Sequence, residues 1–381
     1  MGNKSVAILD VRSMSVTAVI GEAGVNNTFI FKGSQSQSYE GYENGRFYSV
    51  KDLKDAVYTV LNAAEGSANE HLKTVYVGVP GEFIKIVNKK HMIGFATPKR
   101  ISAGDKEMLF KDGYGTIEES AYENIHTSAL YFITSDSRKV RDPSGIVSST
   151  LQANVCYMLS STYFNSTLRD MLREYGFKNV YFVPTSYAQA TYLLSEEKRR
   201  ESAVMLDIGT LSSTVSIVYG DGIFQEKTFW VGEGHIVAEL CQKWEISYAD
   251  ALEVLKQANL FRLGGVDIQI TEDKRVTVDK VNEIIKFGLD KLCEPLAAFL
   301  EECSAISANR TLLITGEGIT GIRGAVEHIS KRLNRETDVL APELPYYNKP
   351  SMSSKISLLH YALKNRKKEG FFNKLLNGFG G

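Results

Sequence analysis

The sequence predicts a duplicated α/β fold of two lobes, with a small α+β subdomain inserted into the first lobe. Its 381 residues exceed one ordinary core and suit two lobes of roughly 150–200 residues each. A pattern of strand, aspartate, small-residue turn and strand occurs twice, in residues 6–24 and 204–222. The composition changes over residues 82–150, which indicates the inserted subdomain.

The first lobe begins with an α/β half. Apolar alternation predicts strands at residues 5–10 and 16–20, and a third at 28–32. Residues 52–65 carry apolar side chains at helical spacing and predict an amphipathic helix, which leads to a buried strand at 74–79. Strand, hairpin, helix and strand together form one half of the lobe.

The insertion, residues 82–150, combines strand-like segments with a polar stretch. Residues 82–93 and 129–134 alternate like strands, and "RDPSGI" at 141–146 is a turn signal. The first lobe then resumes with a strand, a helix ending at Gly176, a strand and a helix, which are expected at residues 151–159, 163–175, 180–183 and 185–194.

The second lobe repeats the order of the first. The charged segment "SEEKRRES" at residues 195–202 is expected to be a solvated connection. After the repeated hairpin, the segment "WVGEGHIVAELCQKW" (230–244) predicts a glycine turn that opens a helix. Two more helices, a buried strand and a further helix are expected at residues 248–259, 278–303, 310–315 and 325–333. The coarse order is therefore that of a duplicated α/β protein.

Composition excludes several classes of function. Lys and Arg number 44 against 45 Asp and Glu, so there is no basic excess to bind nucleic acid. The cysteines lack metal-ligand spacing and are expected to be reduced, buried cytosolic thiols: Cys156, Cys241, Cys293 and Cys303. No apolar run approaches the roughly 18–20 residues of a membrane span, so we do not expect an integral membrane protein.

The repeated turns point to phosphate chemistry. A carboxylate at a strand end can hold a hydrated Mg²⁺, which nominates Asp10 and Asp207, while small turn residues let backbone N–H groups approach a phosphate. The loop at 315–318 would approach the nucleoside. The candidate nucleotide-binding residues are Asp10, Arg12, Ser13, Asp207, Gly209, Ser212, Gly316 and Gly318.

In this order, the three motifs resemble the nucleotide signature of the actin, sugar-kinase and chaperone-ATPase superfamily. Within it the chain most resembles the bacterial cell-division protein FtsA, over nearly its whole length. Further segments similar to that family are "TVYVGVPGEFIKIVN" (74–88), "PTSYAQATYLL" (184–194) and "VGEGHIVAEL" (231–240). The resemblance implies an actin-like (ribonuclease H-like) two-lobe fold.

The resemblance also implies a division of the chain. Lobe I comprises residues 1–81, 151–194 and 350–363, and residues 82–150 are its inserted subdomain. Lobe II comprises residues 195–349. A basic linker at 364–370 and an amphipathic tail at 371–381 complete the chain.

The chain departs from the family pattern at the proposed nucleotide site. Arg12 stands where the family usually has Gly, Ser15 where it has Lys, and Glu317 where a Gly would let the backbone approach the nucleotide. Val183 replaces the Glu that often positions the attacking water. The second hairpin lacks two further glycines and an acid, at Thr210, Leu211 and Thr214.

These departures remove catalytic groups and add bulk, so no catalytic residue is assigned. We expect Mg-ATP to bind weakly or not at all and to be hydrolysed negligibly. Arg12 has two interpretations: its guanidinium grips a phosphate, or it plugs the vacated site by pairing with Asp10 or Asp207.

The last residues, "EGFFNKLLNGFGG", predict an amphipathic helix after the basic run "KNRKK" (364–368). Its apolar face is about 140° wide on a helical wheel. Together with the anionic-lipid attraction of its Lys, this face predicts weak, reversible binding to a membrane surface. The candidate membrane-binding residues are Phe371, Phe372, Lys374, Leu375, Leu376 and Phe379. The alternatives are a last helix packed on the body of the protein, or a frayed end.

The leading hypothesis for function is therefore a non-enzymatic scaffold. By its resemblance to FtsA, it would self-associate into filaments on the inner face of the cytoplasmic membrane at the division site. There it would tether the tubulin-like FtsZ through the C-terminal peptide of FtsZ. The alternatives are a pilus-assembly protein resembling PilM, whose family typically lacks such a tail, and an active ATPase or small-molecule kinase of the same superfamily.

Overall fold

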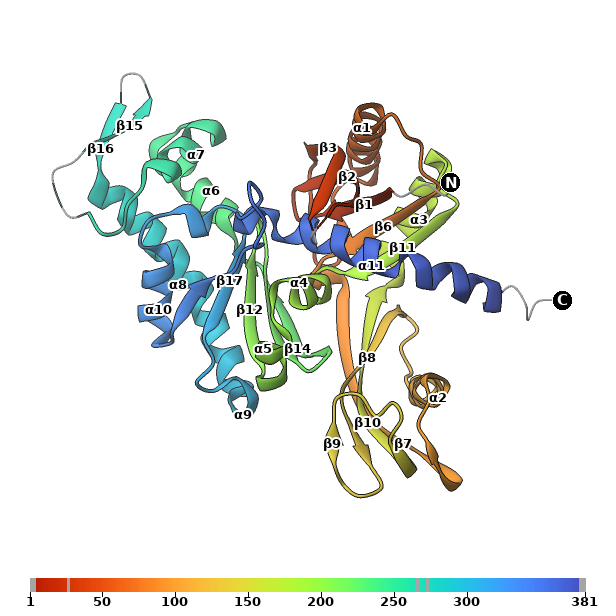
Figure 1. The fold of residues 1–381 in the computed structure, drawn as a ribbon. Coiled ribbons are helices and arrows are strands. Elements are labelled where there is room, and N and C mark those ends of the chain that lie inside the picture. Colours follow the sequence, from red (N-terminus) through yellow and green to blue (C-terminus); the bar gives the residue numbers. More distant parts are fainter. Residues whose placement is uncertain (1–4, 26–27, 263, 265–266, 272–273, 377–381) are drawn as a thin grey trace. The chain divides into compact units, whose positions relative to one another are not determined.

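The computed structural model describes residues 5–25, 28–262, 264, 267–271 and 274–376, with the backbone alone at 271 and 367–376 (Figure 1). The chain forms two compact units. Unit 1 comprises residues 1–195 and 354–381, and unit 2 comprises residues 196–353. The chain therefore passes from one unit to the other twice.

Unit 1 is built on a five-stranded sheet with the order β11-β6-β1-β2-β3. The strands are β1 (Val6–Val11), β2 (Ser15–Ala23), β3 (Phe29–Ser38), β6 (Thr74–Val79) and β11 (Asn179–Pro184). A two-stranded hairpin follows β3, formed by β4 (Tyr42–Glu43) and β5 (Arg46–Phe47). The helices of this unit, apart from the insertion, are α1 (Val50–Ala68), α3 (Thr162–Tyr175), α4 (Thr185–Leu193) and α11 (Ser353–Leu376).

Helix α1 follows the sequence prediction closely. The Ser49 side chain accepts a hydrogen bond from the N–H of Asp52, and Asn69 ends the helix in the left-handed conformation. Its buried side chains are the apolar ones that the helical spacing singled out: Leu53, Ala56, Val57, Val60, Leu61 and Ala64. The helix packs against β3, where Gly33 lets the strand backbone approach the carbonyl of Ala64.

The insertion is a four-stranded antiparallel sheet, β7-β10-β8-β9, and one helix (Figure 1). Its elements are η1 (Gly81–Phe83), β7 (Ile84–Arg100), α2 (Ala103–Tyr114), β8 (Tyr122–Thr134), β9 (Lys139–Val140) and β10 (Val147–Ser161). The predicted boundary after residue 150 falls inside β10. The predicted strand at 151–159 therefore belongs to the sheet of the insertion and not to the five-stranded sheet, because β10 pairs with both β7 and β8 along its length.

Unit 2 repeats the sheet of unit 1. Its strand order is β14-β13-β12-β17-β18, which matches β3-β2-β1-β6-β11 position by position. The strands are β12 (Ala203–Ile208), β13 (Ser213–Tyr219), β14 (Gly222–Phe229), β17 (Leu312–Gly316) and β18 (Thr337–Val339). In both units the first two strands are antiparallel and the next neighbours are parallel. This common topology is what a duplicated half predicts.

The remaining elements of unit 2 lie around this sheet and beyond it. The helices are α5 (Glu196–Glu201), α6 (Glu233–Trp244), α7 (Tyr248–Gln257), α8 (Val278–Glu302), α9 (Ser304–Ser307) and α10 (Ala325–Leu333), with short turns η2 (Ile319–Gly321) and η3 (Pro350–Met352). A small hairpin, β15 (Asp267–Thr271) and β16 (Lys274–Thr277), stands at the far end of the unit from α9 (Figure 1). The predicted solvated connection at 195–202 contains α5, none of whose residues is buried and in which Arg200 pairs with Glu196 one turn away.

Helix α11 joins the core of unit 1 to the predicted tail. Leu358, Leu359 and Ala362 are fully buried in the cluster that also contains Ile8 and Val183. The helix then continues without a break through residues 364–370, which we expected to be a linker, as far as Leu376 (Figure 1). The predicted tail therefore begins within a helix that is anchored in the core.

Candidate nucleotide site

The first hairpin places Asp10 at the end of β1, with only 2% of its surface exposed. The turn is closed by a hydrogen bond from the N–H of Arg12 to the carbonyl of Ser15, 2.8 Å. The Ser354 hydroxyl, in the first turn of α11, donates to Oδ1 of Asp10 over 2.6 Å. One oxygen of the predicted metal ligand therefore already accepts a charge-assisted hydrogen bond from the protein.

The second hairpin has the same geometry. Gly209 N–H donates to the carbonyl of Ser212 over 2.9 Å, as Arg12 does to Ser15. Asp207 lies opposite Thr214 in the register, as Asp10 lies opposite Thr17. The predicted repeat is thus confirmed at the level of individual hydrogen bonds and residue pairs.

Helix α6 begins directly against the second hairpin. The N–H groups of Glu233 and Gly234 donate to the carbonyls of Gly209 and Thr210, over 3.0 and 2.8 Å. A Cβ at Gly232 would overlap the backbone of the turn, so only Gly permits this approach. Two of the helix N-terminal donors, which in other proteins bind phosphate, are therefore satisfied by the chain itself.

The loop after β17 also packs on the second hairpin. Gly316 has a positive φ of 104°, and its Cα lies beside Oδ1 of Asp207. Gly318 has a φ of 67°, and the carboxylate of Glu233 lies directly against it, in the space that a Cβ would take. The predicted residues of unit 2 are therefore brought together, and the bare backbone at Gly318 is covered by a carboxylate.

Glu233 is a site residue that the sequence prediction missed. Burial, and secondarily the nearby Glu317, raises its pKa to about 7. Glu317 is held by Thr210, whose hydroxyl donates to its Oε2 over 3.3 Å. The phenol of Tyr248 also has a raised pKa, chiefly through burial and then through the charge of Glu233. The sequence signal was the "GEG" at the start of α6, whose acid could have been considered beside Gly318.

The candidate residues fall into two groups, one in each unit. Asp10, Arg12 and Ser13 belong to unit 1, and the other five belong to unit 2. Among the residues whose placement is described, no three His, Cys, Asp or Glu side chains form a group that could hold a metal ion.

The predicted membrane-binding side chains lie outside what the structure describes. The backbone of α11 includes Phe371, Phe372, Lys374, Leu375 and Leu376, whose side chains are not described, and Phe379 lies beyond the described residues. Within the described part of the chain, no helix is both long enough and apolar enough to span a bilayer.

Comparison with solved structures identifies the fold class of the chain. No protein-family model matches the chain. Among solved structures, the PilM-PilN type IV pilus biogenesis complex matches with a TM-score of 0.65 and 14% identity, over 94% of this chain and 98% of the other. MreB5 of Spiroplasma citri bound to AMPPNP matches with a TM-score of 0.56 and 11% identity, over the whole of both chains. The fold is therefore actin-like, as the sequence predicted.

Comparison with the sequences of characterised proteins points to one family within the actin-like proteins. FtsA of Pseudomonas aeruginosa is 18% identical over 378 residues, which cover 95% of this chain and 90% of that protein. FtsA of Streptococcus pneumoniae is 20% identical over 368 residues, covering 93% and 79%. FtsA of Escherichia coli K12 is 18% identical over 384 residues, covering 94% and 90%. The chain is therefore similar to FtsA over most of its length, at 18–20% identity.

Proposed function

We propose that this chain is an actin-like scaffold of bacterial cell division, which self-associates into filaments on the inner face of the cytoplasmic membrane at the septum. The observation that carries the proposal is its similarity to FtsA over more than nine tenths of the chain, together with the duplicated actin-like fold. The chain is expected to act in the divisome by binding partners and not by catalysis.

The proposed nucleotide site is degenerate. Val183, at the position of the family's usual acid, is buried in the apolar core of unit 1, where it cannot orient water. In unit 2, the carboxyl group of Glu233 lies against the bare backbone at Gly318, where the nucleotide would have to approach. One oxygen of Asp10 already accepts a hydrogen bond from Ser354. These features support weak or absent binding of Mg-ATP.

Isothermal titration with Mg-ATP tests the degenerate site. We expect a dissociation constant above about 1 mM and no steady hydrolysis, because binding must displace the carboxyl group of Glu233 from Gly318. The control is Asp207→Asn, since heat that persists in this variant does not arise from the hairpin site. Micromolar binding with continuous turnover would contradict the proposal.

The C-terminal segment is proposed to bind the membrane. Helix α11 is anchored in unit 1 by Leu358 and Leu359, and its backbone is helical to Leu376. A rigid connection to the core would hold the apolar face of the tail at the membrane surface. One tail binds weakly, and a filament with many tails binds firmly through avidity.

Flotation with vesicles of anionic lipid tests the anchor. The double variant Phe371→Asp and Leu375→Asp is expected to reduce the bound fraction at least about 10-fold, because two charges enter the apolar face. The matched control, Asn373→Asp and Asn377→Asp, adds the same charge to the polar face and should still float. Equal flotation of the first variant and the parent would refute the anchor.

The proposed partner is the C-terminal peptide of FtsZ, which the chain would tether to the membrane. A second candidate function, in pilus assembly, is favoured by the TM-score of 0.65 against the PilM-PilN complex. Fluorescence anisotropy with a labelled FtsZ C-terminal peptide separates the two: binding that saturates supports the division scaffold. A chain that binds neither this peptide nor the membrane would favour the pilus-type scaffold.

A further inference from the structure

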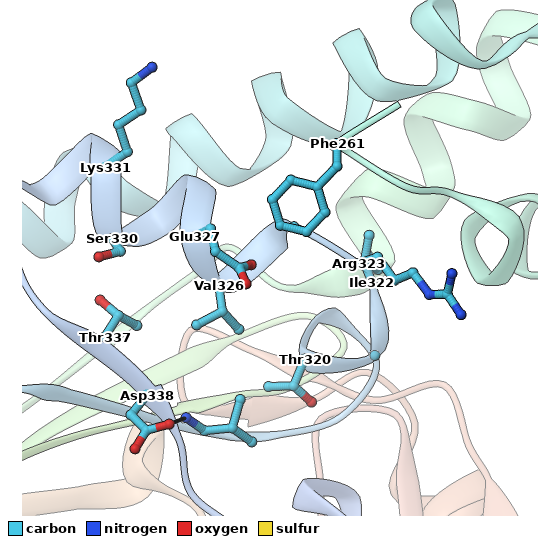
Figure 2. Close-up of a pocket in the computed structure, with 13 residues that line it drawn as sticks. Phe261, Thr320, Ile322, Arg323, Val326, Glu327, Ser330, Lys331, Thr337 and Asp338 are labelled. Atoms are coloured by element: carbon cyan, nitrogen blue, oxygen red, sulfur yellow. Dashed lines mark hydrogen bonds between the residues drawn. The ribbon is translucent and has the colours of Figure 1, made fainter. Parts of the chain in front are cut away.

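Unit 2 has a surface pocket of about 640 Å³ that the candidate nucleotide site does not use (Figure 2). It lies between α10, the edge strand β18, the loop after η2 and Phe261. Phe261 and Val339 are 64% and 42% exposed, and Val326 is a further apolar residue of the lining. A large apolar side chain in solvent at the rim of a hollow is typical of a binding surface.

The polar groups of the pocket favour a side chain as its occupant over an added strand. The pairing of β18 with β17 runs through Glu336 and Leu340, so the N–H of Val339 points to the outer edge. That N–H donates to Oδ1 of Asp338 over 2.8 Å, which blocks main-chain pairing there (Figure 2). Arg323, Glu327 and Lys331 remain around the opening as polar partners.

A second exposed feature of the same unit is the side chain of Tyr346. Tyr346 is 95% exposed, and its φ of +69° lies in the left-handed region that favours Gly. It occupies the third position of a turn closed by the N–H of Tyr347 and the carbonyl of Leu344, 3.1 Å, with Pro345 in the second position. The chain thus holds an aromatic ring in solvent on a strained backbone, which is an arrangement associated with binding.

We propose that Tyr346 of one copy of this chain inserts into the pocket of a second copy. The ring would pack on Phe261 and Val326, and its hydroxyl would reach Lys331 or Glu327 at the opening. Arg323 can stack on the face of an aromatic ring. Both parts of the contact are therefore present in every molecule.

This contact rests on the proposed function, in which the chain self-associates. It assigns that self-association to two surfaces, the turn that carries Tyr346 and the pocket. The inserted tyrosine and the pocket are different patches, so a head-to-tail pair keeps one free tyrosine and one free pocket. Further copies can then add at either end. The contact predicts open assembly that grows with protein concentration.

Sedimentation of the full chain at increasing concentration tests the contact. Tyr346→Ser is expected to raise the dissociation constant for self-association at least about 10-fold, whereas Tyr346→Phe retains it. Tyr346→Gly should associate as poorly as Tyr346→Ser while its melting temperature does not fall, since Gly suits the positive φ. The matched control is Tyr48→Ser, which removes an exposed tyrosine from unit 1.

Cross-linking identifies the partner surface. A mixture of the single variants Tyr346→Cys and Val339→Cys is expected to give a disulfide-linked dimer on mild oxidation, at a higher yield than either variant alone. The inference would be overturned if Tyr346→Ser associated as strongly as the parent, or if the mixture gave no excess of cross-linked dimer. Self-association would then have to use another surface. A parent chain that stays monomeric at every concentration, in solution and on anionic vesicles, would overturn both.

Discussion

Replacing Glu233 by Gln is expected to stabilise unit 2 at pH 8 by about 3 kcal/mol at most. The pKa of this carboxyl is raised from 4.5 to about 7, chiefly by burial and then by Glu317. At a pH between these two pKa values, the carboxyl group is therefore protonated in the folded state and ionised in the unfolded state. Stability of the parent falls as the pH rises from about 4.5 through 7, and the neutral amide does not have this penalty.

Urea unfolding at pH 4.5 and at pH 8 measures the effect. The difference between Glu233→Gln and the parent should be small at the lower pH and large at the higher one. Glu239→Gln, on the same helix but paired with Lys291 at the surface, is the matched control and should show no such gain. A destabilised Glu233→Gln at pH 8 would mean that the carboxylate makes a favourable contact there as an anion.

The opposite pH dependence is expected at His126 in unit 1. This half-buried side chain contacts α4 and α11, with its ring centroid 4.0 Å from that of Tyr187 and 6.2 Å from that of Tyr361. Its Nδ1 lies 3.4 Å from the hydroxyl of Tyr361, and its Nε2 is buried without a hydrogen-bond partner in the described structure. Burial lowers the pKa of the imidazole from 6.5 to about 4.

Acidification is therefore expected to cost unit 1 about 3 kcal/mol through His126. The unfolded state takes up the proton near pH 6.5 and the folded state only near pH 4. Stability is complete above pH 6.5 and is lost as the pH falls towards 4. His126→Phe removes this loss, and at pH 7 it is expected to be neutral or stabilising because an unsatisfied buried nitrogen disappears.

The measurement is the difference in unfolding free energy between His126→Phe and the parent, at pH 7 and at pH 4.5. The pKa of Glu82, in the same unit, is raised to about 7, chiefly by burial, so its effect on stability falls in the same pH range with the opposite sign. Because Glu82 is present in both proteins, its effect cancels in the difference. The control His91→Gln leaves the buried imidazole in place, so the acid-induced loss should remain. An equal loss in His126→Phe and the parent would show that His126 is not its origin.

The local pattern of residues was sufficient to predict the bounds of those helices and strands that have one apolar and one polar face. The strand β6 and the helix α10 begin and end where the sequence predicted, at 74–79 and 325–333. In α10, Ala325 and Ile329 are one turn apart and buried, and Asn334 ends the helix in the left-handed conformation. The spacing of these residues carries the information without any distant contact.

Helix α2 was not predicted, because its sequence has no apolar stripe. Its buried residues are Asp105, Leu109 and Gly113, of which one alone is a large apolar side chain. The helix is fixed instead by a capping box between Ser102 and Asp105 and by the hydroxyl of Tyr157, which donates to the carbonyl of Phe110 over 2.9 Å. The contact to Tyr157 comes from β10, far along the chain, so no local window contains it.

The chain order of apolar and polar residues already specified two related α/β halves and the two hairpins with their aspartates, because burial of one face selects the period of each element. It could not specify which sheet β10 joins, nor that the carboxylate of Glu233 lies on Gly318 and the hydroxyl of Ser354 on Asp10. Those outcomes depend on contacts between segments far apart in sequence, which form only when the elements pack. The same packing, by desolvation, raises the pKa of Glu233 and lowers that of His126.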